Sequence, residues 1–311
     1  MMKLTWLLRA TRKNILIKLK QKSIIKKRWN MKDLSNETII HKKSNNIEYL
    51  QFKKLLEYKD ILKHAYSLGL DKNFRTARAK NAIPLTKEEY EKAVNDYKEL
   101  ADKIGINYIN IAKPNQAHTK NIKTVEQKVK NNEPDFNLEE YAQIDGLVTD
   151  KKNIALATTN ADCILLLFFD PKRKVIANVH SGWKGTLQKI SVEAVNEMIK
   201  KYNCNPEDII CCICPSIRKC HFKVHKDVKE PFYNEFKDLK EINEIIVPVE
   251  NEDRWSIDTV KINKIILEQV GLKKENIIDC GICSVCNSDL IHSYRVEKEG
   301  FGLATALIEL N

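Results

Sequence analysis

Apolar residues recur along this chain with two different spacings, and each spacing predicts its own kind of element. Behind the capping box of Thr86 and Glu89, apolar side chains return every three or four positions, which predicts an amphipathic helix over 87–104. The same spacing predicts further helices over 190–202, 224–236 and 258–270.

Short apolar runs between polar stretches predict buried strands instead. These runs lie at 106–112, 124–129, 154–158, 163–169, 174–180, 209–214, 245–249, 277–282 and 292–294. Asp170 and Pro171 have the turn chemistry of a hairpin. Residues 48–67 fit a strand followed by a helical turn, whereas the polar stretch 131–141 fits a surface connection. Because strands and helices mix without regular alternation, we expect an α+β fold, a single large domain with mixed β-sheets flanked by helices.

Positive charge is concentrated at the N-terminal end. The 311 residues have a formal net charge of +11, but residues 1–30 hold ten Lys or Arg and no acidic residue, so the rest is nearly neutral. This distribution argues against specific nucleic-acid binding by the body of the protein. We expect residues 1–30 to be a disordered or dispensable extension, with a membrane-surface arm or a targeting segment as alternatives. The catalytic domain is expected over 50–311.

Apolar runs and cysteine content indicate a cytoplasmic protein. No run is long enough for a membrane span, and Leu4–Leu8 is too short for the apolar core of a secretory signal. Nine cysteines, an odd number, favour thiols or metal ligands over a disulfide framework.

Cys283 and Cys286 have the spacing of a metal knuckle or of a redox pair. A structural zinc would need a second pair of ligands, for which Cys280, or Cys220 with His221, is available. Separate thiols are the alternative interpretation.

A second candidate for metal binding involves one cysteine and one histidine. Cys163 opens one predicted strand and His180 closes the next. If a hairpin joins these strands, the two side chains lie at the same end and can converge on one ion. A thiolate and an imidazole suit zinc or copper. Their spacing fits no standard zinc finger, so the residues alone leave open whether a metal binds.

Around these two residues the chain resembles the multicopper polyphenol oxidase-like, or laccase-domain, family, whose members are also called purine nucleoside phosphorylase-like. The matching elements follow the family order over most of residues 60–311: Gln116-Ala-His118, Asp145-Gly-Leu-Val-Thr, Ala161-Asp-Cys163, His180-Ser-Gly-Trp-Lys-Gly, Cys214-Pro-Ser-Ile, Cys220-His-Phe-Lys-Val, Trp255-Ser-Ile-Asp258, Cys283-x-x-Cys286 and Ser293-Tyr-Arg295. So many ordered matches are hard to obtain by chance.

The resemblance implies a metal, usually zinc with copper as the alternative, held by His118, Cys163 and His180. Three protein ligands with an open fourth position are typical of catalytic rather than structural zinc. The resemblance also implies purine nucleosides and phosphate as partners. The implied reactions are phosphorolysis of adenosine, inosine and methylthioadenosine to base and ribose 1-phosphate, and deamination of adenosine.

The chemistry of this site suggests roles for individual residues. Cys163, His180 and Asp162 are the candidate catalytic residues. Asp162 is expected to orient a histidine or move a proton, with a buried turn carboxylate as the alternative. The candidates for contacts with phosphate or ribose are Arg75, Lys184 and Arg295, each with a solvated cation as the alternative. Ser216 either contacts the ligand or caps the next segment.

The chain also departs from the family pattern. Lys184 replaces an arginine, Val296 replaces the second arginine after Ser-Tyr, and Phe301-Gly-Leu303 replaces Thr-Gly-Arg. The family has an Arg-Gly-Gly element near its start, whereas this chain has Arg75 followed by threonine and alanine. We therefore expect weaker phosphate binding than in relatives. Two other functions stay open, a copper-dependent polyphenol oxidase and a factor that edits peptidoglycan precursors, although seven dispersed histidines suit multicopper clusters poorly.

Overall fold

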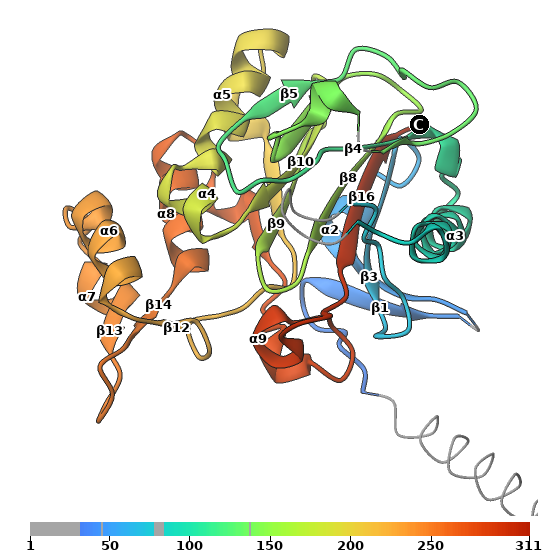
Figure 1. Cartoon of the computed structure of the whole chain (residues 1–311). Coiled ribbons are helices and arrows are strands. Elements are labelled where there is room, and N and C mark those ends of the chain that lie inside the picture. Colours follow the sequence, from blue (N-terminus) through green and yellow to red (C-terminus); the bar gives the residue numbers. More distant parts are fainter. Residues whose placement is uncertain (1–31, 45, 78–83, 137) are drawn as a thin grey trace, which may run out of the picture. The chain divides into compact units, whose positions relative to one another are not determined.

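Two large β-sheets form the centre of the unit made by residues 35–311 (Figure 1). The structure is a computed structural model that describes residues 32–44, 46–77, 84–136 and 138–311. The expected N-terminal extension, residues 1–30, therefore lies outside the described residues. The folded unit begins before the expected residue 50, because residues 39–43 already pair with 48–52 as a hairpin.

The first sheet has seven strands, and most adjacent strands within it run antiparallel. Its order is β1 (Ile39–Lys43), β2 (Glu48–Phe52), β3 (Leu62–Leu68), β16 (Ala304–Leu310), β8 (Ala155–Asn160), β4 (Ile111–Lys113) and β6 (Asp135–Phe136). The last two join in parallel, so the sheet is mixed. A short helix, α2 (Lys53–Leu56), connects β2 to β3.

The second sheet has six strands and carries the hairpin that matters for function. Its order is β15 (Ile277–Asp279), β11 (Ile210–Ile213), β9 (Ile164–Asp170), β10 (Val175–Ser181), β7 (Gly146–Thr149) and β5 (Ile122–Thr124). Every residue of β9 and β10 is buried, which explains why both read as almost continuous apolar runs.

The two sheets pack face to face, and helices cover their outer faces (Figure 1). The buried amide of Asn178 in β10 donates to the carbonyls of Leu156 (2.9 Å) and Ala306 (2.8 Å), which belong to the other sheet. The helices α5 (Ile190–Tyr202) and α8 (Thr259–Gln269) bury their apolar stripes against the six-stranded sheet. Helix α3 (Lys87–Ile104) packs on the seven-stranded sheet.

A third, three-stranded sheet has its own small apolar cluster with the neighbouring helices. It contains β12 (Lys223–Val224), β14 (Trp255–Ile257) and β13 (Ile246–Pro248), beside α6 (Lys226–Phe236) and α7 (Ile242–Ile245). Single 3-10 turns occur at Tyr108–Asn110, Glu139–Tyr141, Pro206–Asp208, Lys274–Asn276 and Val285–Asn287. Among the described residues, no helix is both long enough and apolar enough to cross a membrane.

The α+β prediction is confirmed, and most predicted elements are present within a few residues of their expected ends. The predicted strand at 292–294 is wrong. Helix α9 (Tyr294–Glu297) starts there, because the Ser293 hydroxyl accepts from Val296 N and the Glu297 carboxylate accepts from Ser293 N. The run 124–129 is also misplaced, since β5 ends at Thr124.

The polar stretch 131–141 is not a simple surface connection. It contains β6, where the carboxylate of Asp135 is fully buried. Lys128 pairs with that carboxylate at 3.0 Å, and the amides of Val129 and Lys130 donate to it. A buried charge with this set of partners is satisfied, so a polar sequence can lie inside the fold.

Candidate metal centre

The β9–β10 hairpin places Cys163 and His180 at one end of the six-stranded sheet. Asp170 makes the turn, because its Oδ1 accepts from the amides of Lys172 (2.8 Å) and Arg173 (2.9 Å). In the resulting register His180 pairs with Leu165, so the residue just before β9 lies next to the end of β10. The predicted hairpin is confirmed.

His118 comes from a separate loop and completes a group of three. The loop follows β4, and His118 has a left-handed backbone with φ of 61°. His118 Nε2 lies 3.8 Å from Cys163 Sγ, and the ring centroids of His118 and His180 are 4.9 Å apart. One ligand atom from each of the three residues lies within 4.8 Å of the others. We call this group the His–Cys–His cluster.

Asp145 is the buried carboxylate that holds this cluster together. Its side chain accepts from the amides of Ala117, His118 and Thr119, which fixes the loop that carries the first histidine. The same carboxylate contacts His180 Nδ1 at 2.8 Å. The other ring nitrogen, Nε2, is thereby left to face an ion, the usual arrangement behind a metal-binding histidine.

A role for Asp145 was not predicted from sequence, although this residue opens one of the motifs shared with the family. The available signal was its place directly before a buried strand, together with its membership of that motif. A role for Gln116 was also not predicted from sequence. In the structure it ties the histidine loop to β8, since its amide donates to Thr159 O (2.7 Å) and accepts from Thr159 N (2.8 Å).

Two side chains of the cluster, Cys163 and His180, have shifted pKa values. Burial raises the pKa of the Cys163 thiol, but the neighbouring His180 and His118 outweigh burial and lower the pKa to about 6. Burial lowers the pKa of His180, but the Cys163 thiolate and Asp145 outweigh burial and raise the pKa to about 9. A thiolate at neutral pH is the form that binds a metal ion.

Gly182 leaves the space that an ion bound by this cluster would need. A Cβ atom on Gly182 would lie 2.6 Å from His118 Cδ2 and 3.3 Å from Cys163 Sγ. The backbone φ of −64° suits any residue, so space rather than conformation calls for glycine here. One thiolate, two imidazoles and a carboxylate behind one of them fit zinc or copper.

The structure gives Asp162 a different set of partners from those expected. Its Oδ1 accepts from Ser284 Oγ (2.6 Å) and its Oδ2 from Arg295 N (2.7 Å). Its backbone has φ of 83°, an unusual value for a residue with a side chain. Asp162 therefore joins the turn before Cys163 to the loop that carries Arg295, while the carboxylate that contacts His180 belongs to Asp145.

The four candidates for substrate contacts fall into different environments. Lys184 is exposed on α4 (Trp183–Leu187), with Nζ 5.4 Å from the ring centroid of Trp183. Ser216 is buried, and its hydroxyl has no hydrogen-bond partner among the described residues. Arg295 donates from Nη1 to the carbonyls of His221 (3.2 Å) and Lys223 (3.3 Å).

Arg75 belongs to a stack of side chains that also includes Tyr294. Its guanidinium carbon lies 4.3 Å from the ring centroid of Phe301, and its Nη2 donates to Phe301 O at 2.7 Å. Tyr294 contacts the same Phe301 ring edge-on at 5.1 Å and is exposed. Arg75 and Tyr294 thus share one aromatic neighbour.

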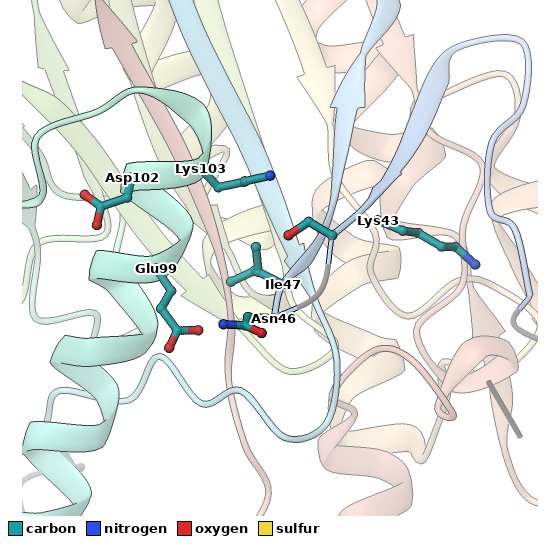
Figure 2. Close-up of a pocket in the computed structure, with 7 residues that line it drawn as sticks. Lys43, Asn46, Ile47, Glu99, Asp102 and Lys103 are labelled. Atoms are coloured by element: carbon teal, nitrogen blue, oxygen red, sulfur yellow. The ribbon is translucent and has the colours of Figure 1, made fainter. Parts of the chain in front are cut away.

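A separate cavity has a volume of about 640 Å³. Figure 2 shows the residues that line it. It lies between the β1–β2 hairpin and α3, and its lining mixes both signs of charge: Lys43, Ser44, Asn46, Ile47, Glu99, Asp102 and Lys103. None of the cluster's ligands is among these lining residues, and the cavity offers no cysteine or histidine. It does not serve the chemistry of the His–Cys–His cluster.

Comparisons with known proteins point to one family. The human protein named purine nucleoside phosphorylase LACC1 is 32% identical over 170 residues, which is 53% of this chain and 38% of the human protein. The Bacillus subtilis protein named purine nucleoside phosphorylase YlmD is 30% identical over 164 residues, 53% of this chain and 58% of the relative. This chain thus spans about half the length of these relatives.

The fold comparison agrees with the sequence comparison. The crystal structure of the Bacillus licheniformis hypothetical protein YfiH superposes with a TM-score of 0.73 and 21% identity, covering 86% of this chain and all of that one. Residues 78–311 match the family described as multi-copper polyphenol oxidoreductase laccase, and these residues contain the whole His–Cys–His cluster. The chain is therefore a member of the multi-copper polyphenol oxidoreductase laccase family.

Proposed function

We propose that this chain is a zinc-dependent purine nucleoside phosphorylase that also deaminates adenosine. Its substrates would be adenosine, inosine and methylthioadenosine, each split by phosphate into base and ribose 1-phosphate. The observation that carries the proposal is the His–Cys–His cluster, with three ligands and Asp145 behind His180. The names of the human and Bacillus subtilis relatives support the choice of reaction.

His118, Cys163 and His180 would hold the zinc ion. When bound, zinc lowers the pKa of a coordinated water and polarises a substrate oxygen or ring atom. Asp145 keeps His180 Nδ1 hydrogen-bonded, so that the ring cannot rotate away from the ion. Asp162 is a positioning residue in this proposal, because both of its carboxylate oxygens accept hydrogen bonds from the loop beyond the cluster.

Substrate contacts would come from the elements next to the cluster. Lys184 follows Gly182 by two residues and presents an exposed ammonium group, which suits a phosphate. Tyr294 presents an exposed ring beside Phe301, and an aromatic face of this kind suits a purine base. Arg295 links the two regions, since its amide donates to Asp162 next to the metal ligand Cys163.

The distribution of histidines argues against multicopper oxidase chemistry. Of the seven histidines, His118 and His180 lie together in the cluster. The remaining five have other neighbours: His41 contacts Glu48, His64 accepts from Phe52 N, His221 contacts Cys220, His225 contacts Asp253 O and His292 contacts Glu297. A cluster of several coppers needs more imidazoles in one place than this arrangement supplies.

The test offers the purified chain inosine or adenosine with and without phosphate. We expect base and ribose 1-phosphate to appear only with phosphate, and ammonia to be released from adenosine in either case. Zinc-loaded and copper-loaded protein are compared in parallel with a phenolic substrate. Copper-dependent phenol oxidation without base release from any purine nucleoside would overturn the proposal in favour of the oxidase.

A further inference from the structure

Four more ligand groups converge outside the His–Cys–His cluster. They are Cys220, His221, Cys283 and Cys286, here called the Cys3His cluster, and their ligand atoms lie within 4.8 Å of one another. The first two come from the loop between β11 and β12, and the last two from the loop after β15. Cys280 lies instead beside Arg218, whose Nη2 is 3.4 Å from its sulfur.

We propose that the Cys3His cluster is a second metal centre, which binds one zinc ion through all four side chains and clasps the two loops together. The Cys3His set is a common composition for structural zinc. Four protein ligands leave no open position for a substrate, so this centre is distinct from the His–Cys–His cluster in kind as well as in place. The inference does not depend on the proposed function.

The distances match the edges of a zinc tetrahedron. His221 Nδ1 lies 3.2, 3.6 and 3.5 Å from the sulfurs of Cys220, Cys283 and Cys286. Cys220 Sγ lies 3.6 Å from Cys283 Sγ and 3.9 Å from Cys286 Sγ. Tetrahedral bonds of about 2.3 Å to sulfur and about 2.0 Å to nitrogen separate two sulfurs by about 3.8 Å, and sulfur from nitrogen by about 3.5 Å.

The composition of the cluster argues against a redox pair. A disulfide joins only two sulfurs, whereas three sulfurs converge here. A redox pair also has no use for an imidazole nitrogen within 3.6 Å of three sulfurs, whereas a metal site needs such a donor. The separations are those of ligands around an ion.

Contacts that need no metal already hold the two loops side by side. Arg218 forms a bidentate ion pair with Asp279, at 2.7 and 2.9 Å, and donates from Nε to Ile282 O at 3.1 Å. Ser284 N donates to Ser216 O at 3.0 Å, next to the cluster. Because these contacts order the loops in advance, little conformational freedom is left to lose when an ion binds.

Accessibility also fits ion binding. Cys283 is buried and His221 is half-buried, whereas Cys220 and Cys286 are exposed. An ion can therefore reach the ligands from the surface and is then enclosed by protein donors on the inner side. Soft thiolates with one imidazole select zinc over magnesium or calcium.

Hydrogen bonds connect this centre to the other cluster. Ser284, the neighbour of a cysteine ligand, donates to Asp162 Oδ1 at 2.6 Å. Arg295 donates from Nη1 to His221 O at 3.2 Å and from its amide to Asp162 Oδ2 at 2.7 Å. A zinc ion in the Cys3His cluster would thus steady the residues next to Cys163 without touching the substrate.

The test counts zinc and sulfur in the full chain, purified from zinc-supplemented medium. Elemental analysis gives the zinc content, and X-ray absorption at the zinc edge gives the average number of sulfur ligands per zinc. We expect two zinc ions per chain with an average of two sulfurs, because one centre supplies a single sulfur and the other three. In Cys286→Ser we expect one zinc and an average of one sulfur.

Cys204→Ser is the control, since Cys204 belongs to neither cluster, and it should keep both zinc ions. A wild-type chain with a single zinc bound by one sulfur would overturn the proposal, as would retention of two zinc ions in Cys286→Ser. A disulfide between cysteines of the cluster in the native chain would do the same. If Cys286→Ser does not fold, the average sulfur number of the wild-type chain decides alone. None of these readouts depends on turnover, and a wild-type chain with a single zinc bound by three sulfurs would support the Cys3His centre even if the His–Cys–His cluster held no zinc.

Discussion

The His–Cys–His cluster offers three ligands and the Cys3His cluster four, and the two differ just as clearly in what surrounds them. Behind the first cluster Asp145 is buried and accepts several hydrogen bonds, and Gly182 keeps a space clear beside the ligands. The second cluster bridges two loops near the surface. A site with three protein ligands held by neighbouring hydrogen bonds leaves one coordination position for a substrate and suits catalysis. A site with four protein ligands leaves none and suits a structural role. The number of ligands and their supporting contacts therefore distinguish two sites that are both built from cysteine and histidine.

Filling the space beside the first cluster should have the largest effect. In Gly182→Ala the new methyl group meets the ring of His118 at 2.6 Å, so the ring must move off the position where it faces Cys163. We expect zinc affinity at the His–Cys–His cluster to fall at least about 100-fold, more than for loss of an outer-shell partner. Competition with a zinc chelator measures this. The Cys3His cluster is the internal control, and equal weakening of both centres would contradict the steric account.

Removing the charge behind the first cluster should have the next largest effect. Asp145→Asn replaces one acceptor oxygen by an amide that cannot hold His180 Nδ1 and the loop amides together. We expect zinc affinity at that cluster to fall about 10–100-fold. Asp135→Asn is the matched control, because Asp135 is also fully buried and accepts from backbone amides. It should affect stability but leave zinc affinity unchanged, and a similar loss of affinity in both variants would remove Asp145 from the account.

Lys184→Ala should separate the two proposed reactions. The exposed ammonium group is a phosphate contact in the proposal, and its removal should raise the KM for phosphate about 10-fold. Adenosine deamination needs no phosphate and should change less. Steady-state rates of base release and ammonia release measure the split, with exposed Lys201→Ala as the control. Equal loss of both reactions would place Lys184 at the base or the ribose.

Acid should affect the fold at a residue that belongs to neither cluster. Acid also protonates metal ligands and so releases metal. The effect of acid on the fold is therefore measured on metal-depleted protein. Burial lowers the pKa of His64 to about 3, and its ring accepts from Phe52 N. Between about pH 6.5 and about pH 3, His64 is protonated in the unfolded chain but not in the folded chain. The free energy of unfolding therefore falls as the pH falls.

The slope from this one group should approach about 1.4 kcal/mol per pH unit. His64→Gln should remove that part of the slope, and exposed His225→Gln should not. Denaturant unfolding of the metal-depleted variants between pH 4 and pH 7 measures the difference. An unchanged slope in His64→Gln would show that other groups set the acid limit.

Elements with local signals were predictable from sequence. The helix over 87–104 begins at the Thr86–Glu89 capping box, as expected, and the Asp170 turn brings Cys163 and His180 together. Strand β16 gave no clear signal, because Ala, Leu and Glu are good helix formers and its strand conformation depends on pairing with β3 and β8.

Contacts between distant segments were not predictable from spacing. His118 lies 45 residues before Cys163, and family resemblance alone suggested it as a ligand. The ligands of the Cys3His cluster come from loops more than 60 residues apart, so the sequence could not choose between Cys280 and the pair that the structure brings together. The role of Asp145 depends on a loop folded around its carboxylate, which no local pattern encodes.

Phosphorolysis by Cys163→Ser, measured with its zinc content, tests the central claim most directly. A hydroxyl is a far poorer zinc ligand than a thiolate at neutral pH. We predict that the variant keeps the zinc of the Cys3His cluster, loses the other, and no longer releases base from inosine in the presence of phosphate. Inosine phosphorolysis at the wild-type rate by a variant that holds only the three-sulfur zinc would contradict the account.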